Sequence, residues 1–83
     1  MIELDARGLK CPLPVLRARK ALSGLSPGEH LLVLVTDQSA PKDFELFCLE
    51  TGHRLISQSI SANETKIVIC RGSSQPKATP TKI

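Results

Sequence analysis

The sequence predicts an α+β fold, a two-layer α/β sandwich in which two helices cover one face of a four-stranded mixed sheet, in the order β-α-β-α-β-β. Apolar residues recur at helical spacing in residues 12–23 and 40–51. The continuous apolar run at 31–35 lies between these segments and is too short for a helix. Residues 53–60 alternate between apolar and polar side chains, and residues 65–71 return as a last strand.

The chain opens with a short strand followed by a loop. Residues 1–5 alternate between apolar and acidic side chains, so Ile2 and Leu4 share one side of this strand. Residues 6–10 form the loop, and Gly8 gives its backbone conformational freedom.

The first helix is expected from Pro12 to about Ser23, with Gly24 at its end. Arg17 and Lys20 are three residues apart on its solvent side. Its buried stripe is expected to comprise Val15, Ala18, Ala21, Leu22 and Leu25.

The apolar run at 31–35 follows a turn at 26–28 and ends at Thr36-Asp37. A strand, a helix and a second strand in this order form a right-handed unit with parallel strands. Functional groups in such units gather near strand C-termini and helix N-termini, which is where Cys11 is found. Asp37 is expected either beside Cys11 or bonded within its own loop.

The second helix begins at Ala40-Pro41 and ends near Thr51, with Gly52 as its stop. Its expected core stripe is Phe44, Phe47 and Cys48, and its expected solvent side carries Asp43, Glu45 and Glu50. Asp43 also complements the dipole of this helix, because it lies in the first turn.

The last part of the domain is a pair of strands joined by a turn at 62–64. The first strand is expected to place Arg54, Ile56, Gln58 and Ile60 on one face. The domain is expected to span residues 1–72. Residues 73–83 contain Pro76 and Pro80 among Ser, Thr and Lys, and are expected to form a flexible tail.

Composition limits the classes of function. The aromatic residues are Phe44 and Phe47, without Trp or Tyr, which argues against direct nucleic-acid binding by base stacking. Three cysteines with wide spacings and no C-x-x-C predict neither a disulfide framework nor a zinc site, and no cofactor is expected. The N-terminus lacks the basic region of a signal peptide and no apolar run could span a membrane, so a cytoplasmic protein without membrane association is expected.

The chemistry is expected at Lys10-Cys11-Pro12-Leu13-Pro14. Proline is favoured at the first helical position, so Cys11 is expected at the N-cap, with the Leu13 and Val15 amides facing its sulfur. The helix N-terminus and nearby cations would favour the reactive thiolate. These cations are Arg7, Lys10, Arg17, Arg19 and Lys20. A buried N-cap cysteine with an ordinary pKa is the alternative.

The segment Leu4-Asp5-Ala6-Arg7-Gly8-Leu9-Lys10-Cys11-Pro12-Leu13-Pro14-Val15 resembles the signature of the TusA/SirA/YeeD family of small C-P-x-P proteins. The resemblance continues in Thr36-Asp37, Asp43-Phe44, Phe47-Cys48 and Gly52-His53-Arg54-Leu55, and covers residues 2–71. It implies the same β-α-β-α-β-β sandwich. It also implies a sulfur carrier, in which Cys11 accepts sulfane sulfur as a persulfide.

The resemblance further implies a cysteine desulfurase or rhodanese-type sulfur donor and a downstream acceptor protein, so the activity would be that of a sulfurtransferase in a relay. Thiolation of tRNA, molybdenum-cofactor maturation and sulfur oxidation all remain open as pathways. Cys11 is the expected persulfide carrier, and the expected supporting residues are Arg7, Lys10, Pro12, Pro14, Arg17 and Asp37. Leu13 stands where tRNA-thiolating members often carry an acid, and Gln38-Ser39 where many relatives place a proline.

Two alternatives belong to other classes of function. The basic first third could make the chain a regulatory module that binds a protein or RNA. Thiol redox sensing would need Cys48 or Cys70 within about 7 Å of Cys11, measured between Cα atoms. Cys48, Cys70 and His53 are expected to be structural. The chain is expected to be a monomer.

Overall fold

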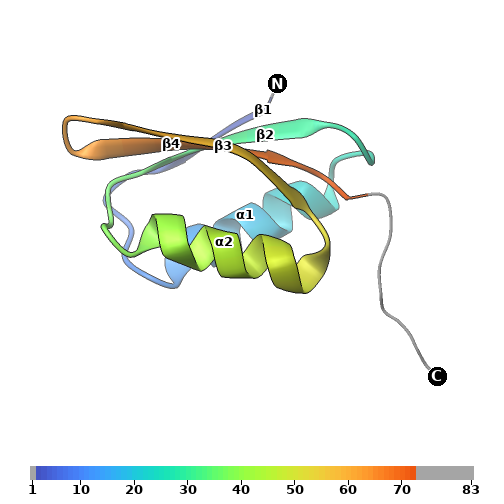
Figure 1. Cartoon of the computed structure of the whole chain (residues 1–83), viewed down its shortest axis with the longest axis horizontal. Coiled ribbons are helices and arrows are strands. Elements are labelled where there is room, and N and C mark those ends of the chain that lie inside the picture. Colours follow the sequence, from blue (N-terminus) through green and yellow to red (C-terminus); the bar gives the residue numbers. More distant parts are fainter. Residues whose placement is uncertain (1, 73–83) are drawn as a thin grey trace.

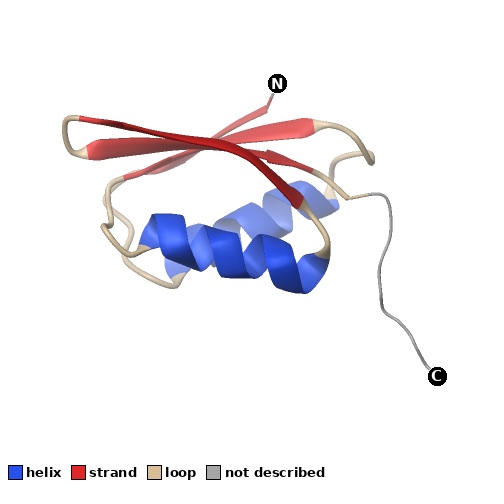
Figure 2. Ribbon diagram, in the orientation of Figure 1, coloured by secondary structure: helices blue, strands red, loops and turns tan. Residues whose placement is uncertain are grey.

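Two helices lie against one face of a twisted sheet in the computed structural model, which describes residues 2–72 (Figures 1 and 2). The elements are β1 (Ile2–Ala6), α1 (Leu13–Ser23), β2 (His30–Val35), α2 (Ala40–Thr51), β3 (Arg54–Ser61) and β4 (Glu64–Cys70). This is the order expected from the sequence. The predicted α+β class, with a four-stranded mixed sheet and two helices, is confirmed.

The sheet has the strand order β1-β2-β4-β3. β1 pairs with β2 in parallel, as expected for two strands joined by α1, whereas β4 pairs antiparallel with both β2 and β3. The parallel pair brings the C-terminal ends of β1 and β2 to the same edge of the sheet. The loops that follow, one towards α1 and one towards α2, therefore start side by side.

The core lies between the sheet and the helices. Its fully or nearly buried side chains are Ala6, Leu31, Val33, Val35, Ile67 and Ile69 from the sheet and Ala18, Leu22, Ala40, Phe44, Phe47 and Cys48 from the helices. Burial of each large apolar side chain stabilises the fold by roughly 1.5–3 kcal/mol. The expected core positions of both helices are confirmed, although Val15, Ala21 and Leu25 are only partly buried.

Strand β3 departs from the alternation expected in the sequence. The pairing of β3 with β4 shifts by one residue between Leu55 and Ser57. Arg54 pairs with Cys70, whereas Gln58 pairs with Ile67, whose side chain faces the core. One extra residue reverses which face the following side chains occupy, so the prediction that Arg54 and Gln58 share a face is wrong.

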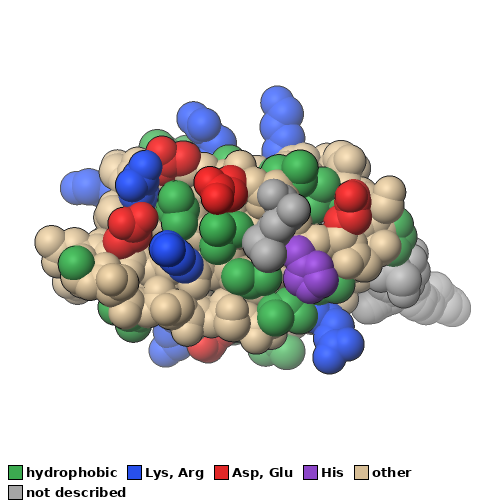
Figure 3. Space-filling model, turned by 90° about the horizontal axis from the view of Figure 1, so that it is seen from above, with side chains coloured by type: hydrophobic (Ala, Val, Ile, Leu, Met, Phe, Trp, Pro, Cys, Tyr) green, Lys and Arg blue, Asp and Glu red, His purple; other side chains and the backbone are tan. Residues whose placement is uncertain are grey.

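The face of the sheet opposite the helices is seen in Figure 3, where hydrophobic side chains lie among acidic and basic ones. Leu32, Leu34 and Val68 are half-buried and alternate with the core residues of their strands. No helix within residues 2–72 has the length and apolar character needed to cross a membrane. The predicted tail, residues 73–83, lies outside the described residues.

Two contacts join the end of β4 to distant elements. The Arg71 side chain donates from Nε to the Leu22 carbonyl at 2.8 Å, which satisfies an acceptor near the end of α1. The Gly72 N–H donates to Nδ1 of His53 at 2.9 Å. His53 also packs against the Phe47 ring, with 5.6 Å between ring centroids. These contacts agree with the expected structural role of His53.

Candidate functional site

Cys11 is exposed in the loop between β1 and α1. Its peptide bond to Pro12 is cis, and the Leu13 N–H donates to the Lys10 carbonyl at 2.8 Å, which closes a turn over residues 10–13. Pro12 is the N-cap and α1 begins at Leu13. The prediction of Cys11 at the N-cap is therefore wrong by one residue. The Leu13 N–H donates its hydrogen bond to the Lys10 carbonyl and is not available to the Cys11 sulfur.

Two side chains of the β2–α2 loop (residues 36–39) accept hydrogen bonds from backbone N–H groups of the loop between β1 and α1 (residues 7–12, called the Cys11 loop below). Asp37 Oδ2 accepts the Cys11 N–H at 2.6 Å, and Thr36 Oγ1 accepts the Gly8 N–H at 2.9 Å. Asp37 Oδ1 accepts the N–H and the hydroxyl of Ser39, at 3.2 and 3.1 Å. The bonds from the Cys11 and Ser39 amides are the main reason why the pKa of Asp37 lies below its ordinary value. Of the two placements expected for Asp37, the structure therefore shows both.

The thiol of Cys11 lies in an acidic environment. A hydrogen bond with the Asp43 side chain, partial desolvation, and the charges of Asp43 and Asp37 raise the pKa of Cys11 above its ordinary value. The S–H donates a hydrogen bond to a carboxylate only while it keeps its proton, and the carboxylate opposes a second negative charge beside it, so both effects favour the thiol. The expected depression of this pKa is wrong. The acids come from the β2–α2 loop and from α2, which the sequence places far from Cys11.

The basic residues that were expected to act on Cys11 make different contacts. Arg7 donates to both carboxylate oxygens of Asp5, at 2.9 and 3.0 Å, and lies 3.6 Å from Glu64. The bonds from Arg7 lower the pKa of Asp5 to about 2. Lys10 is exposed beside Cys11, and its charge contributes to the lowered pKa of Asp37. Arg7 is therefore part of an ion-pair cluster and does not act directly on the sulfur.

The N-terminal end of α1 presents both buried and exposed apolar groups. Pro14 is buried against the core, which fixes the first turn of the helix behind Cys11. Leu13 and Leu16 are 44% and 51% exposed on the same helix. Arg17 is also exposed. Cys11 thus lies at the border of a surface that offers apolar contact and positive charge.

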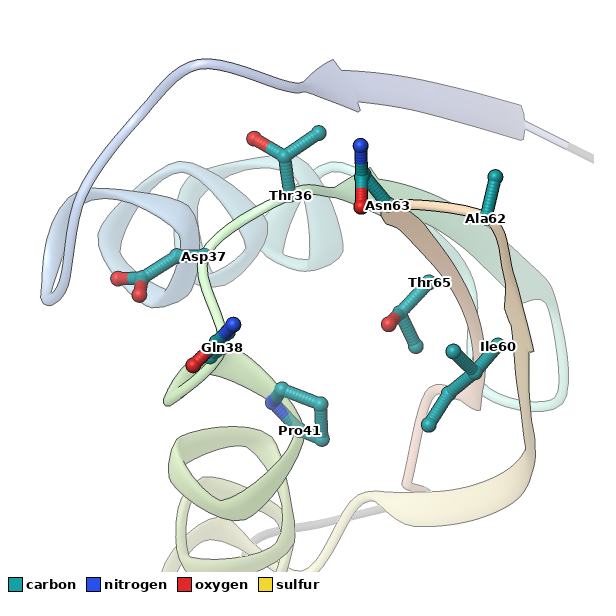
Figure 4. A pocket seen from close by; sticks show the side chains of 8 residues that line it. All are labelled: Thr36, Asp37, Gln38, Pro41, Ile60, Ala62, Asn63 and Thr65. Carbon is teal, nitrogen blue, oxygen red and sulfur yellow. The ribbon is translucent and has the colours of Figure 1, made fainter.

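A hollow of about 380 Å³ lies beside the β2–α2 loop (Figure 4). It is lined by Thr36, Asp37, Gln38 and Pro41 on one side and by Ile60, Ala62, Asn63 and Thr65 of the β3–β4 hairpin on the other. In Figure 4 the Asp37 side chain points away from Ile60 and Thr65. A shallower hollow of about 430 Å³, lined by Gly8, Leu9, Lys10, Thr36, Asp37 and Gln38, lies on the side of the Cys11 loop.

The other two cysteines lie away from this site. Cys48 is buried in the core, and burial raises the pKa of its thiol to about 11. Cys70 pairs with His30, the first residue of β2, whereas Thr36 and Asp37 follow Val35, the last residue of β2. Cys70 is therefore at the opposite end of the sheet from Cys11. The expectation that both are structural agrees with these positions.

The sequence interpretation missed the part that Asp43 and Thr36 take in the site. Asp43 was expected on the solvent side of α2, where it complements the helix dipole, and Thr36 at the end of a strand; both belong to the family pattern, but neither was predicted to contact the segment around Cys11. A polar pair directly after the second strand of a parallel unit, followed by an acid in the first turn of the next helix, is the signal that could have identified them.

Three comparisons agree on one family. The family model described as Sulfurtransferase TusA matches residues 2–71. Two putative sulfur carrier proteins of Neisseria meningitidis are each 59% identical to this chain over 56 residues, which is 68% of this chain and 76% of theirs. The sulfur carrier protein TusA of Allochromatium vinosum is 52% identical over 54 residues, 65% of this chain and 71% of its own. The crystal structure of a SirA-like protein from Desulfitobacterium hafniense superposes with a TM-score of 0.76 at 30% identity, covering 88% of this chain and all of the other.

Proposed function

The chain belongs to the TusA sulfurtransferase family, and from this premise we propose that Cys11 carries sulfane sulfur as a persulfide from a donor protein to an acceptor protein. The observation that supports this most is the exposed thiol on a loop whose backbone is fixed by Asp37 at 2.6 Å. An exposed, positioned sulfur can meet a donor sulfur and then an acceptor sulfur without a deep pocket.

The transfer needs no change in net oxidation state. The Cys11 sulfur, as thiolate, attacks the outer sulfur of a cysteine persulfide on the donor. A new S–S bond forms at Cys11, the S–S bond of the donor breaks, and its electron pair stays on the donor cysteine sulfur. The acceptor thiolate repeats the same exchange on the Cys11 persulfide. The donor proposed is a cysteine desulfurase or a rhodanese-type protein.

We propose that the surface around Cys11 selects the partner proteins. Leu13 and Leu16 offer exposed apolar contact, and Lys10 and Arg17 offer positive charge to acidic partner surfaces. Leu13 replaces the acid often seen in tRNA-thiolating members, so it is proposed to help select the acceptor. Thiolation of tRNA, molybdenum-cofactor maturation and sulfur oxidation are the three pathways that such an acceptor could serve.

Intact-protein mass spectrometry tests this proposal. Wild type and Cys11→Ser are incubated with a cysteine desulfurase and cysteine, with Cys70→Ser as a matched control. Wild type and Cys70→Ser are expected to gain about 32 Da, reversed by reductant, whereas Cys11→Ser gains nothing. Delivery of sulfur by Cys11→Ser, or no gain by wild type with several donors, would contradict the proposal.

A second candidate is the binding module, which the exposure of Arg17 and Lys20 on α1 favours. Neither forms an ion pair within residues 2–72. This function predicts that binding to an acidic protein or to RNA survives Cys11→Ser and is lost in Arg17→Glu/Lys20→Glu. Binding that depends on Cys11 instead would favour the sulfur carrier.

A further inference from the structure

The Cys11 loop is attached to the β2–α2 loop at two points. Thr36 Oγ1 accepts the Gly8 N–H at 2.9 Å, and Asp37 Oδ2 accepts the Cys11 N–H at 2.6 Å. The two donors are three residues apart, whereas the two acceptors are neighbours in the chain (Figure 4). One hydrogen bond fixes a single point of a loop and leaves the loop free to turn about it. Two bonds at separate points also fix the direction of the segment between them.

The Gly8 end of the loop is not held by side-chain packing. Gly8 is exposed, and within residues 2–72 no atom other than those of its chain neighbours lies within 4 Å of the place that a Cβ would take. Its φ of 83° lies in the left-handed region, which glycine adopts readily, and glycine loses more conformational freedom on folding than any other residue. The bond from the Gly8 N–H to Thr36 is therefore the contact that ties this end of the loop to the sheet.

Thr36 suits this part because the chain before it is held on both sides. It follows Val35, the last residue of β2, which pairs with Ala6 of β1 and with Thr65 of β4. Threonine is β-branched, so its side chain has few accessible rotamers. The hydroxyl that accepts the Gly8 N–H is therefore fixed in direction relative to the sheet.

We propose that Thr36 is a positioning residue for sulfur transfer, because its hydroxyl holds Gly8 and so fixes the direction in which the Cys11 loop presents the thiol to a docked protein. This inference rests on the proposed function. Exchange between sulfurs on two proteins requires the attacking sulfur to be aligned with the S–S bond that breaks, and docked proteins cannot turn freely. A small disulfide can approach the exposed thiol from several directions. Thr36 therefore matters for transfer between proteins and not for the reactivity of the thiol itself.

The first test compares Thr36→Val, which keeps the shape of the side chain without the hydroxyl, with Thr36→Ser, which keeps the hydroxyl. Loading by a cysteine desulfurase and cysteine is followed by intact-protein mass in quenched time courses. Thr36→Val is expected to load on the order of tenfold more slowly than wild type, and Thr36→Ser close to wild type. The loss is expected in the maximal rate, with the half-saturating carrier concentration unchanged, because the docking surface on α1 is intact. Equal rates for Thr36→Val and wild type, or a loss confined to the half-saturating concentration, would overturn the proposal.

Two controls separate positioning from a general loss of structure or reactivity. In a Cys70→Ser background, Thr36→Val is expected to react with a neutral dipyridyl disulfide within about twofold of the parent rate, since the thiol keeps its exposure and surroundings. Thr51→Val removes a hydroxyl that donates to the Phe47 carbonyl at 2.7 Å near the end of α2, and it is expected to load like wild type. A loss with the small disulfide as large as the loss in loading, or an equal loss in Thr51→Val, would contradict a positioning role for Thr36.

Amide hydrogen exchange measured by NMR tests the anchor apart from the proposed function. The Gly8 N–H is expected to exchange several-fold faster in Thr36→Val than in wild type, and Thr36→Ser is expected to restore its protection. Equal exchange in wild type and Thr36→Val would show that the hydroxyl does not hold the loop. If wild type accepted no sulfur on Cys11 from several donors, the proposed function would fail, while the exchange of Gly8 would still decide whether Thr36 anchors the loop.

Discussion

At the residue scale, Asp37 holds three donors at once: the Cys11 amide, the Ser39 amide and the Ser39 hydroxyl. These bonds connect the Cys11 loop to the start of α2. They also stabilise the ionised carboxylate over the neutral acid, which explains the lowered pKa of Asp37. The hydrogen bonds that hold the candidate site around Cys11 therefore depend on the Asp37 side chain.

Asp37→Asn is expected to slow persulfide loading of Cys11 on the order of tenfold or more, because a loop displaced by a fraction of an ångström no longer presents the sulfur well.

Folded Asp37 has a pKa below the unfolded value of about 3.9, so its stabilisation is complete above that pH and is lost as pH falls through the folded pKa. Asp37→Asn should therefore unfold less steeply than wild type below about pH 4. Quenched time courses of persulfide loading measure the first effect, and acid unfolding followed by circular dichroism measures the second. Unchanged loading of Asp37→Asn would contradict the first prediction.

His53 gives a second pH dependence at the residue scale. Burial and the charges of Arg71 and Arg19 lower its pKa, and its neutral Nδ1 accepts the Gly72 N–H. The unfolded chain takes up the proton first, at about pH 6.5, so the stability that neutral His53 confers is complete above that pH and is lost as pH falls from there.

His53→Asn is expected to remove this loss, because an amide oxygen can accept the Gly72 N–H without titrating. The difference between the urea midpoints at pH 7.5 and pH 5.5 should be smaller for His53→Asn than for wild type. His30→Asn is the matched control, since His30 is exposed at the start of β2. Equal differences for wild type and His53→Asn would show that His53 does not couple proton binding to folding.

At the residue scale, topology was a better guide than the immediate chain neighbours. Asp37 contacts Cys11, as one of its two expected placements, whereas the prolines beside Cys11 led to the wrong prediction that Cys11 is the N-cap. The direction of the pKa shift of the Cys11 thiol was predicted wrongly, because only the cations near Cys11 in the sequence were counted. Asp43 is 32 residues further along and approaches the sulfur only through tertiary packing.

At the element scale, the two helices end in different ways although both end at glycine. Gly52 has φ 85°, in the left-handed region, and its N–H donates to the Cys48 carbonyl at 3.0 Å. Gly24 has φ −93°, which any residue adopts. Sequence alone predicts a stop at both positions but does not distinguish these two conformations.

Gly52→Ala is expected to lower the free energy of unfolding by about 1–2 kcal/mol, because an L side chain is disfavoured at this φ. No atom lies within 4 Å of the added Cβ, so the cost is conformational. Gly24→Ala is the control. Its Cβ would lie 3.6 Å from the Ala21 carbonyl oxygen, an ordinary contact, and it is expected to be neutral or stabilising by up to about 1 kcal/mol. Urea unfolding measures both, and equal losses would contradict this account.

The period of the apolar residues in the sequence predicted the helices, because their buried side chains recur at helical spacing. The stripes through Ala18 and Leu22 and through Phe44 and Phe47 identified both helices. Periodicity could not identify the bulge in β3, because a one-residue shift in pairing depends on the partner strand. Nor could it show that residues 10–13 close a turn before α1 begins, which moves Cys11 off the N-cap.

At the scale of the whole molecule, the topology separates the three cysteines. Cys11 lies where β1 has ended, beside the C-terminal end of β2, and Cys70 is opposite the first residue of β2. Six residues of strand separate these two ends, roughly 17–20 Å at 3.3 Å per residue. Cys48 is enclosed in the core between α2 and the sheet. The redox-sensor alternative requires a partner thiol for Cys11, and this arrangement offers no accessible one within residues 2–72.

Mild oxidation with diamide is therefore expected to leave the monomer without an internal disulfide. A disulfide requires Cα atoms within about 7 Å, which excludes Cys70, and buried Cys48 resists ionisation because its pKa is raised to about 11. The expected products are covalent dimers that disappear in Cys11→Ser and persist in Cys70→Ser, as measured by non-reducing electrophoresis and peptide mass spectrometry. A monomer lighter by two hydrogen atoms, with Cys11 linked to Cys48 or Cys70, would contradict this separation and favour redox sensing. Dimers linked only through Cys11 would mean instead that Cys11 is the accessible reactive thiol of this chain, as the proposed sulfur carrier requires.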